Sequence, residues 1–586
     1  MLKIFKYLKP KEWMMALFSL IFIVAQVWLD LKAPDYMAEI TTLVQTPDSA
    51  IGDIWLAGAK MLLCTLGSLL SAVIVGFFAA RIAATFSKRL RSLLFNKVDS
   101  FSMEEINRFS TDSLITRSTN DITQIQMLIT MGLMLVIKAP IMAVWAITKI
   151  SGKGFEWTLT TVAAVAILIV LVGVIMIFVI PKFKKMQALT DNMNRVTREN
   201  LTGLRVVRAY NADNYQEKKF EEANEELTST QLYTSRAMAI MMPVMMLIMS
   251  GLSLAIYWIG AYLINAADMV DKLPLFSNMV VFSSYAMQVV MSFLMLVMIF
   301  IMLPRASVSA KRINEVLDTA PTILDGTRTT GVSGVQGEVT FKNVSFKYPD
   351  AADYVLKDVS FTVKQGETIA FIGSTGSGKS TLINLVPRFF DATEGEILVD
   401  GVNIREYTQE TLHNKIGYVP QKAVLFKGSV SSNVAYGENG REGFSADEIK
   451  KAVAIAQGTD FVERMEGGYE ADIAQGGTNI SGGQKQRLAI ARAVYRKPEI
   501  YIFDDSFSAL DYKTDRIVRS VLKKETAGVT SMIVAQRIGT IMDADQIIVL
   551  DEGRMVGQGC HKDLLQTCEV YRQIAMSQLS EEELTS

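Results

Sequence analysis

Long apolar runs in the first half of the chain constrain its fold more than any other feature. Runs near 14–31, 61–80, 158–180 and 238–264 contain almost no charged residue. Each is close to the roughly 20 residues that an α-helix needs to cross a bilayer. From about residue 337 the pattern changes to that of a soluble α/β protein. We therefore predict a transmembrane domain at 1–320, a linker at 321–336 and a soluble domain at 337–586.

The loops between the apolar runs indicate how the chain crosses the membrane. We predict six spans, at roughly 14–33, 56–80, 127–150, 157–181, 238–264 and 276–303. The long loops 81–121 and 182–236 are rich in Lys and Arg, whereas 34–54 has neither and 265–275 has only Lys272. The positive-inside rule then places both termini and the soluble domain in the cytoplasm, with the chain in the cell (plasma) membrane. The first run is too long for a secretory signal core, so we interpret it as a retained helix.

Three ionisable residues lie in or near the predicted spans: Asp30, Lys32 and Lys138. Charges inside a membrane are costly and often line a polar pathway. The alternative is snorkelling of the side chain from a helix end towards water, which we favour for Lys32. For Lys138, just before Pro140, the two interpretations stay open.

Composition excludes several classes of function. The formal net charge is −1, which gives no general case for nucleic acid as a partner. Cys64, Cys560 and Cys568 are too few and too scattered for a disulfide framework. His413 and His561 are the only histidines, so a His/Cys metal cluster is not expected.

The most specific motif is a phosphate-binding loop at 373–380. It reads Gly-Ser-Thr-Gly-Ser-Gly-Lys-Ser, follows the apolar run 368–372 and precedes a helical stretch. This is the G-x-x-x-x-G-K-[ST] motif in its required strand–loop–helix context. The glycines let backbone N–H groups surround the phosphates. The N-terminus of the following helix adds the positive end of its dipole. Lys379 would reach the β- and γ-phosphates, and Ser380 could ligate Mg²⁺.

A second apolar strand, 500–503, ends in Asp504. An acidic residue at the end of such a strand holds Mg²⁺ in phosphate-loop enzymes. Many strands end in Asp, so this residue is informative only together with the loop at 373–380.

Residues 480–484, Ile-Ser-Gly-Gly-Gln, resemble the signature motif of ATP-binding cassette (ABC) proteins. Gln421 resembles the family's Q-loop residue, Tyr348 the aromatic that stacks on adenine, and 508–511 the D-loop. In the membrane part, 109–122 and 203–210 resemble the intracellular loops of exporters, whose tips form coupling helices. The resemblance spans nearly the whole chain.

The resemblance implies a fold, cofactors and a set of site residues. The fold class is a membrane α-helical domain of six transmembrane helices (type I ABC exporter fold) fused to an α/β P-loop NTPase domain, with ATP and Mg²⁺ as cofactors. The ATP-binding residues would be Tyr348, Gly373, Ser374, Thr375, Gly376, Ser377, Gly378, Lys379, Ser380, Thr381 and Gln421. The Mg²⁺ ligands would be Ser380, Gln421 and Asp504, and the signature residues acting on partner-bound ATP would be Ser481, Gly482, Gly483 and Gln484. The catalytic positions would be Asp505, Gln536 and Asp511.

Two of these catalytic positions depart from the family pattern. Asp505 stands where the family has Glu as general base, and Gln536 stands where it has the switch histidine. Asp is one methylene shorter, and a misplacement near 1 Å can cost about a hundredfold in rate. Gln536 can donate a hydrogen bond but cannot exchange a proton near pH 7. We expect a site that binds ATP and hydrolyses it slowly.

In the family each ATP lies between two cassettes, and this chain has only one. Its own signature is intact while its catalytic positions are altered. This asymmetry favours a heterodimer with a second, different half-transporter that supplies Glu and His.

We therefore expect ATP-driven export of small hydrophobic, drug-like compounds by alternating access, through the lipid bilayer and without nucleic acid. Methionines such as Met241 and Met245 would suit varied apolar ligands, although we favour the simpler explanation that they face lipid or pack between helices. The alternatives are a homodimeric lipid or peptide exporter and an ATP-sensing regulatory subunit.

Overall fold

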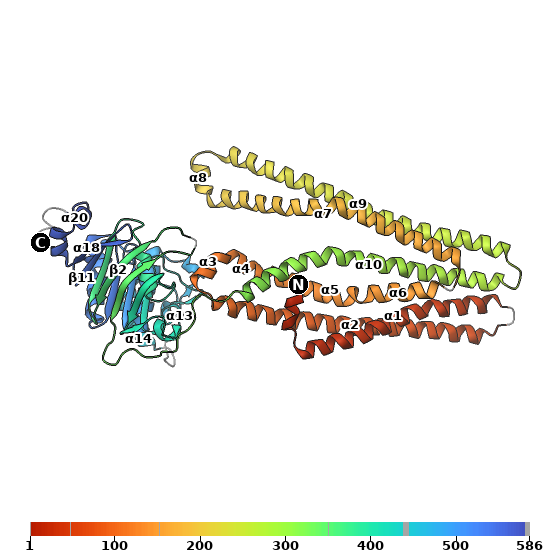
Figure 1. Cartoon of the computed structure of the whole chain (residues 1–586), viewed down its shortest axis with the longest axis horizontal. Coiled ribbons are helices and arrows are strands. Elements are labelled where there is room, and N and C mark those ends of the chain that lie inside the picture. Colours follow the sequence, from red (N-terminus) through yellow and green to blue (C-terminus); the bar gives the residue numbers. More distant parts are fainter. Residues whose placement is uncertain (1, 47–48, 152, 350, 438–444, 580–586) are drawn as a thin grey trace. The chain divides into compact units, whose positions relative to one another are not determined.

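The computed structural model describes residues 2–46, 49–151, 153–349, 351–437 and 445–579 (Figure 1). The chain divides into two compact units. The first unit comprises Met1–Asp99 and Asp112–Thr319, and the second comprises Ser100–Thr111 and Ala320–Ser586. A short segment from the first half of the sequence therefore groups with the C-terminal unit. The exact domain boundaries at 320 and 336 stay a prediction.

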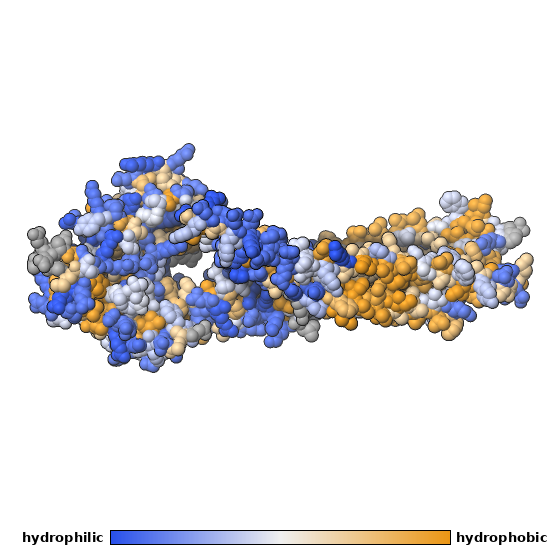
Figure 2. All heavy atoms as spheres, turned by 90° about the horizontal axis from the view of Figure 1, so that it is seen from above, coloured by the Kyte–Doolittle hydropathy of each residue, from blue (hydrophilic) through white to orange (hydrophobic). Residues whose placement is uncertain are grey.

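The first unit is built from long helices. It begins with a 3₁₀ turn, Leu2–Tyr7, and continues with α1 (Pro10–Gln45), α2 (Ile51–Asp99), α4 (Thr111–Ser118), α5 (Asn120–Met131), α6 (Lys138–Ile150), α7 (Phe155–Thr202), α8 (Leu204–Ala209), α9 (Asp213–Ala266) and α10 (Lys272–Asp318). Six stretches of helix are long and apolar enough to cross a membrane, which confirms the predicted number. Figure 2 shows the hydrophobic side chains that these helices present at the surface.

Several helices continue far beyond the length that a bilayer requires. At about 1.5 Å per residue, the 54 residues of α9 span about 80 Å, against about 30 Å of hydrocarbon. The extensions carry the basic loops of the sequence, which are helical as their periodicity predicts. The short helices α4 and α8 lie within the segments 109–122 and 203–210 that resemble coupling loops.

The third span is not a uniform helix. Between α5 and α6 the backbone forms a π-helical turn at Gly132–Val136. Pro140 lacks an N–H group, so the carbonyl of Val136 has no regular partner four residues later. The π-helical turn changes the hydrogen-bond register just before this proline. Such turns inside α-helices often occur at functional positions.

Small residues let the first two long helices approach closely. Ser68, Ser71 and Ala79 of α2 are buried, and Ile23 and Val27 of α1 are buried as well. In a membrane, helix association depends on such close packing because lipid is as apolar as Leu. A second cluster around Trp157, Phe282 and Tyr285 joins α6, α7, α9 and α10.

The second unit contains three sheets and the short helix α3 (Met103–Phe109). One sheet has the order β2-β1-β4-β5, with β1 (Val339–Phe346), β2 (Leu356–Val363), β4 (Glu394–Val399) and β5 (Val402–Asn403). The main sheet has the order β12-β11-β3-β10-β9-β6, with β3 (Thr368–Gly373), β6 (Ile416–Val419), β9 (Ile500–Asp504), β10 (Thr530–Val534), β11 (Gln546–Asp551) and β12 (Arg554–Gly559). A small third sheet pairs β7 (Gly428–Ser429) with β8 (Asp472–Ile473).

Helices cover the main sheet and form a separate helical region. They are α11 (Lys379–Leu385), α12 (Gln409–Asn414), α13 (Val430–Val434), α14 (Ala446–Ile455), α15 (Thr459–Val462), α16 (Gly482–Arg496), α17 (Tyr512–Glu525), α18 (Ile538–Ile541), α19 (His561–Thr567) and α20 (Glu569–Met576), with 3₁₀ turns at Gly468–Glu470 and Gln475–Gly477. One apolar core lies where α11 meets β1, β3, β9 and β10, and a second lies among α13 to α17. The fold class is therefore six membrane-length helices joined to a P-loop α/β domain, as predicted.

Candidate nucleotide site

Parallel strands bring the predicted nucleotide residues to one edge of the main sheet. Strands β3, β10, β9 and β6 are neighbours and run in the same direction. The phosphate loop follows β3, Gln536 follows β10, Asp504 ends β9 and Gln421 follows β6. Ligands of α/β sheets bind outside the carboxyl ends of such strands. Residues separated by more than 160 positions in the sequence thus meet at one site.

The phosphate loop needs glycine at its two ends. A Cβ atom on Gly373 would lie 1.9 Å from the carbonyl oxygen of Leu550, which is impossible without moving the neighbouring strand. Gly378 precedes α11 with φ +97°, a left-handed conformation that residues with a side chain rarely adopt. The loop is therefore fixed by its backbone, with N–H groups at the start of α11 available for an anion.

Lys379 folds back over this loop. Its Nζ donates hydrogen bonds to the carbonyl oxygens of Gly373 at 2.9 Å and Ser374 at 2.8 Å. Burial lowers the pKa of the Lys379 ammonium, and the carboxylates of Asp505 and Asp504 partly oppose this shift. An anionic ligand would favour the charged form further.

Ser380 and Asp504 form the candidate metal site. The Ser380 hydroxyl donates to Asp504 Oδ1 at 2.7 Å, and Asp504 is only 5% exposed. Burial raises the pKa of Asp504, and the nearby Asp505 carboxylate raises it further. In the part of the chain that the structure describes, no group of three or more His, Cys, Asp or Glu residues could hold a metal alone. One hydroxyl and one buried carboxylate fit Mg²⁺, which usually takes its other ligands from phosphates and water.

The carboxylate of Asp505 is held by two amide side chains. Gln536 Nε2 donates to Asp505 Oδ2 at 2.8 Å, and Gln421 Nε2 donates to the same oxygen at 3.1 Å. Asp505 is 6% exposed, and burial raises its pKa while the Gln421 and Ser508 hydrogen bonds partly oppose this. Its backbone also has a positive φ of 45°. The sequence predicted that Asp505 and Gln536 are altered, but not that they would contact each other.

Tyr348 lies beside the phosphate loop as the predicted adenine platform. Its hydroxyl shares a 3.0 Å hydrogen bond with Thr381 Oγ1. Its ring packs edge-on against Phe346 and Phe390, with centroids 5.0 and 5.3 Å away. These contacts fix the orientation of the Tyr348 ring.

The signature and D-loop residues cap helices. Ser481 caps α16 together with Gln484, since Gln484 N donates to Ser481 Oγ and Ser481 N donates to Gln484 Oε1. Asp511 caps α17 by accepting from Thr514 N at 3.0 Å. Gly482 and Gly483 form the first residues of α16, so the signature presents a helix N-terminus.

The two histidines are engaged elsewhere. His413 Nε2 lies 2.8 Å from the Pro387 carbonyl, and His561 Nδ1 lies 2.6 Å from the Tyr571 hydroxyl. Neither replaces the missing switch histidine. All three cysteines are free.

The transmembrane unit holds a polar cluster of its own. Lys138 of α6 pairs with Asp30 of α1 at 3.0 Å, and Asp30 also accepts from the Ser68 hydroxyl. Five residues along α1, Asp35 pairs with Lys149 of α6 at 2.8 Å. Asp35 also accepts a hydrogen bond from the Tyr285 hydroxyl. Its carboxylate lies 3.8 Å from the Lys32 ammonium, so Lys32, for which we favoured snorkelling, has an ion-pair partner. The Asp35–Lys149 pair was not predicted from the sequence.

Family models match both parts of the chain, and known proteins match between 77% and 99% of it. The ABC transporter transmembrane region matches residues 16–293, and the ABC transporter model matches residues 356–508. An uncharacterized ABC transporter ATP-binding protein of Mycobacterium tuberculosis is 42% identical over 80% of this chain and 79% of its own. Another, from Bacillus subtilis, is 34% identical over 99% of both chains. An ATP-dependent lipid A-core flippase of Pseudomonas fluorescens is 33% identical over 77% of this chain and 74% of its own.

A solved structure shares the fold as well. A bacterial Atm1-family ABC exporter with ATP bound has a TM-score of 0.80 and 25% identity, covering 97% of this chain and 98% of that one. The family implies an ATPase coupled to transport. The chain belongs to the ABC transporters and is an exporter half-transporter that joins a multi-pass transmembrane domain to a nucleotide-binding domain.

Proposed function

We propose that this chain is the degenerate-site subunit of a heterodimeric exporter that moves small hydrophobic, drug-like compounds out of the cell. The nucleotide-binding domain would be cytoplasmic and the transmembrane domain would lie in the plasma membrane. ATP would bind on this chain's phosphate loop, and hydrolysis at a second site would drive each transport cycle.

The contact that carries this proposal is the one between Asp505 and its two amides. A general base must accept a proton from the attacking water with a free lone pair. Oδ2 of Asp505 already accepts from both Gln421 and Gln536, which leaves Oδ1 as the oxygen that could take the proton. Asp505 is shorter than Glu, and Gln536 has no imidazole, so both residues are expected to slow hydrolysis.

The remaining site residues support ATP binding. Tyr348 would stack on adenine, residues 373–379 and Thr381 would surround the phosphates, and the Lys379 ammonium would turn from backbone carbonyls to the β- and γ-phosphates. Mg²⁺, held by Ser380, Asp504 and the Gln421 carbonyl, would neutralise charge on the phosphates. Asp511 would keep the D-loop in place for the partner cassette.

The intact signature supports the need for a partner. Ser481 and Gln484 present the capped N-terminus of α16, which favours an anion. In an ABC dimer it would complete the site formed on the other subunit. A different partner with Glu and His would make that site the fast one, whereas a homodimer would have two slow sites.

Two alternatives have specific support. The lipid A-core flippases among the relatives favour a lipid exporter, which with one kind of subunit would be a homodimer. The altered pair Asp505 and Gln536 is equally compatible with an ATP-sensing subunit that binds nucleotide without driving transport.

Transport in proteoliposomes separates these functions. The chain, alone and co-purified with its native membrane partner, is reconstituted and assayed for ATP-dependent movement of a hydrophobic dye and of a fluorescent phospholipid. Lys379→Ala serves as the control that removes phosphate binding. We expect dye movement only with the partner. Lipid movement by the lone chain would favour the homodimeric flippase, and ATP binding without movement of either probe would favour the sensor.

A further inference from the structure

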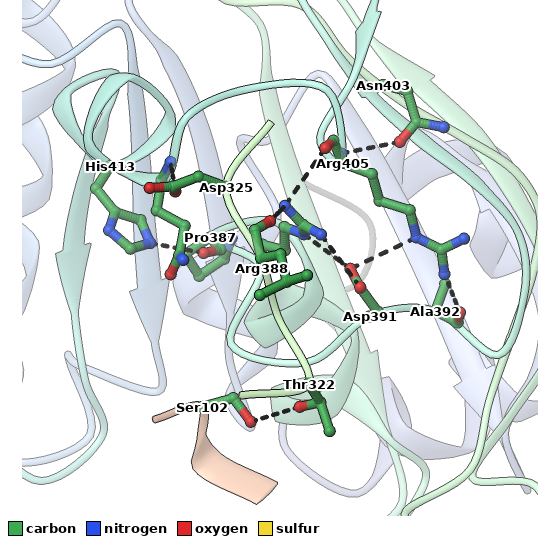
Figure 3. Close-up of polar contacts among 12 residues, drawn as sticks. Ser102, Thr322, Asp325, Pro387, Arg388, Asp391, Ala392, Asn403, Arg405 and His413 are labelled. Carbon is green, nitrogen blue, oxygen red and sulfur yellow. Dashed lines mark hydrogen bonds and ion pairs between the residues drawn. The ribbon is translucent and has the colours of Figure 1, made fainter. Parts of the chain in front are cut away.

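Three chain segments meet in the second unit beside the adenine platform. The first is Ser100–Thr111, which contains α3. The second is the linker segment, residues 320–328, which follows α10. The third is the loop 386–392, which follows α11 (Figure 3). Hydrogen bonds that involve Glu105 and Arg388 join them.

Arg388 is at the centre of this junction. Its Nε and Nη2 donate to the two carboxylate oxygens of Asp391 at 2.9 and 3.3 Å. Its Nη1 donates to the carbonyl oxygen of Leu324 at 2.9 Å. Arg388 is 6% exposed, and a buried guanidinium stays charged, so it needs all these partners.

The backbone of Arg388 is also unusual. Its φ is +57°, a left-handed conformation that costs free energy for a residue with a side chain. Such conformations persist where the surrounding structure requires them, often at functional positions. The conformation allows one side chain to reach both Asp391 and the linker segment.

The linker segment is ordered along its length. Thr322 N donates to Glu105 Oε1 at 3.0 Å, which joins it to α3, and Glu105 is only 3% exposed. Gly326 N and Arg328 N donate to the carbonyl oxygens of Tyr407 and Glu406 at 2.9 and 2.8 Å. Leu324, between these two attachments, is held by Arg388.

The same loop contacts the adenine platform. Phe390 lies between Arg388 and Asp391 in sequence, and its ring packs at 90° against Tyr348 with centroids 5.3 Å apart. A cavity of about 310 Å³ lies alongside, lined by Ser102, Thr322, Phe346, Phe390 and Asp391 among others. Space next to Phe390 permits the loop to shift when a base packs on Tyr348.

We propose that Arg388 is a positioning residue that couples the adenine platform to the linker segment. Nucleotide on Tyr348 fixes Phe390, Phe390 fixes the loop 386–392, and the Arg388 guanidinium transmits this order to Leu324. The linker segment continues directly from the last membrane-length helix, α10, so nucleotide binding tightens the connection through which that helix is attached. This inference rests on the proposed role of Tyr348 in ATP binding.

Arg405 provides a matched control. It is also an arginine beside Asp391, at 3.5 Å, and it donates to the Ala392 carbonyl at 2.6 Å. Among the described residues, however, its side chain makes no hydrogen bond to 320–328. Arg405→Met therefore removes a cation from the same loop without touching the linker segment.

The test is amide hydrogen exchange of the full-length chain in lipid nanodiscs, with and without Mg²⁺-ATP. We expect ATP to slow exchange at 322–328 in the unmodified chain and in Arg405→Met. In Arg388→Met we expect exchange about tenfold faster there, with no response to ATP, because a charge-assisted bond to Leu324 is lost. Binding of a fluorescent ATP analogue should stay within about twofold, since Arg388 does not contact the phosphate loop.

Arg388→Lys is a control for misfolding of Arg388→Met. It keeps the positive charge, but a lysine cannot bind Asp391 and Leu324 at the same time. It should also lose the ATP response of the linker segment. The proposal is wrong if either Arg388 variant responds to ATP like the unmodified chain, or if Arg405→Met loses the response equally. Failure of the unmodified chain to bind the ATP analogue would instead contradict the proposed function, and the nucleotide-free exchange rates would still test the Arg388–Leu324 contact.

Discussion

At Asp505, one of the two carboxylate oxygens is occupied by two amide donors. Oδ2 accepts from Gln421 and Gln536, and the sequence change from Glu to Asp also shortens its reach. In the structure the carboxylate joins two amides that follow β6 and β10.

The charged form of Asp504 lowers the stability of the fold, because its carboxylate is buried and lies near the carboxylate of Asp505. The pKa of Asp504 is raised, so the folded chain binds more protons than the unfolded chain between the two pKa values, and stability falls as pH rises through that range. We expect Asp504→Asn to raise the Tm by about 2–4 °C without Mg²⁺-ATP at neutral pH, the shift that about 1 kcal/mol produces in a domain of this size. The gain should shrink as the pH falls below the raised pKa, where the unmodified Asp504 is also neutral.

Differential scanning fluorimetry across pH measures this effect. Exposed Asp353 offers the control variant Asp353→Asn, which should shift the Tm little. A lower Tm for Asp504→Asn at neutral pH, in the presence of EDTA, would show that the buried carboxylate stabilises the domain without its metal.

Among the helices, the paired charges of α1 and α6 stand out. Asp30–Lys138 and Asp35–Lys149 connect the same two helices, and Tyr285 of α10 joins the second pair. Their side chains are about one-fifth to one-third exposed, so each charge depends on its partner as well as on solvent.

We expect Lys138→Met to destabilise the transmembrane unit by about 3–5 kcal/mol, because it leaves the Asp30 carboxylate without its partner. The double variant Asp30→Asn/Lys138→Met should recover most of this loss. Thermal unfolding in detergent, with both single variants and the double variant, measures the coupling. A double variant that is as unstable as the sum of the single variants would contradict the ion-pair interpretation.

The sequence predicted the helices and strands more completely than it predicted the contacts between them. The apolar runs gave six membrane-length helices, and the loop at 373–380 gave the strand–loop–helix unit of β3 and α11. The π turn at Gly132–Val136 was missed, because a proline can equally kink a helix or shift its hydrogen-bond register. The Asp35–Lys149 pair was missed because the sequence alone does not show which faces of α1 and α6 meet.

For the site, the strand ends were the useful signal. Asp504 and the phosphate loop could be predicted to meet, since parallel strands end at one edge. The bonds from Gln421 and Gln536 to one oxygen of Asp505 could not, because they depend on side-chain rotamers.

At the scale of the whole molecule, ATP binding and hydrolysis should be separable in this chain. The phosphate loop, Lys379 and Tyr348 do not require a partner, so the lone chain should bind Mg²⁺-ATP. At a concentration about 100 times the Kd, binding should stabilise it by about 2.7 kcal/mol. Lys379→Ala should abolish the corresponding shift in Tm, whereas Ser481→Ala, which changes the signature, should keep it. An equal loss in both variants would mean that binding already needs a dimer.

The most direct test is ATP turnover by the chain purified alone, with ATP binding measured on the same sample. It is compared with Asp505→Glu/Gln536→His, which restores the family's general base and switch histidine. The account predicts that the unmodified chain binds ATP but barely hydrolyses it, and that the double variant is at least about tenfold faster. Brisk hydrolysis by the unmodified chain, at a rate equal to that of the double variant, would contradict the degenerate site and favour a homodimeric exporter.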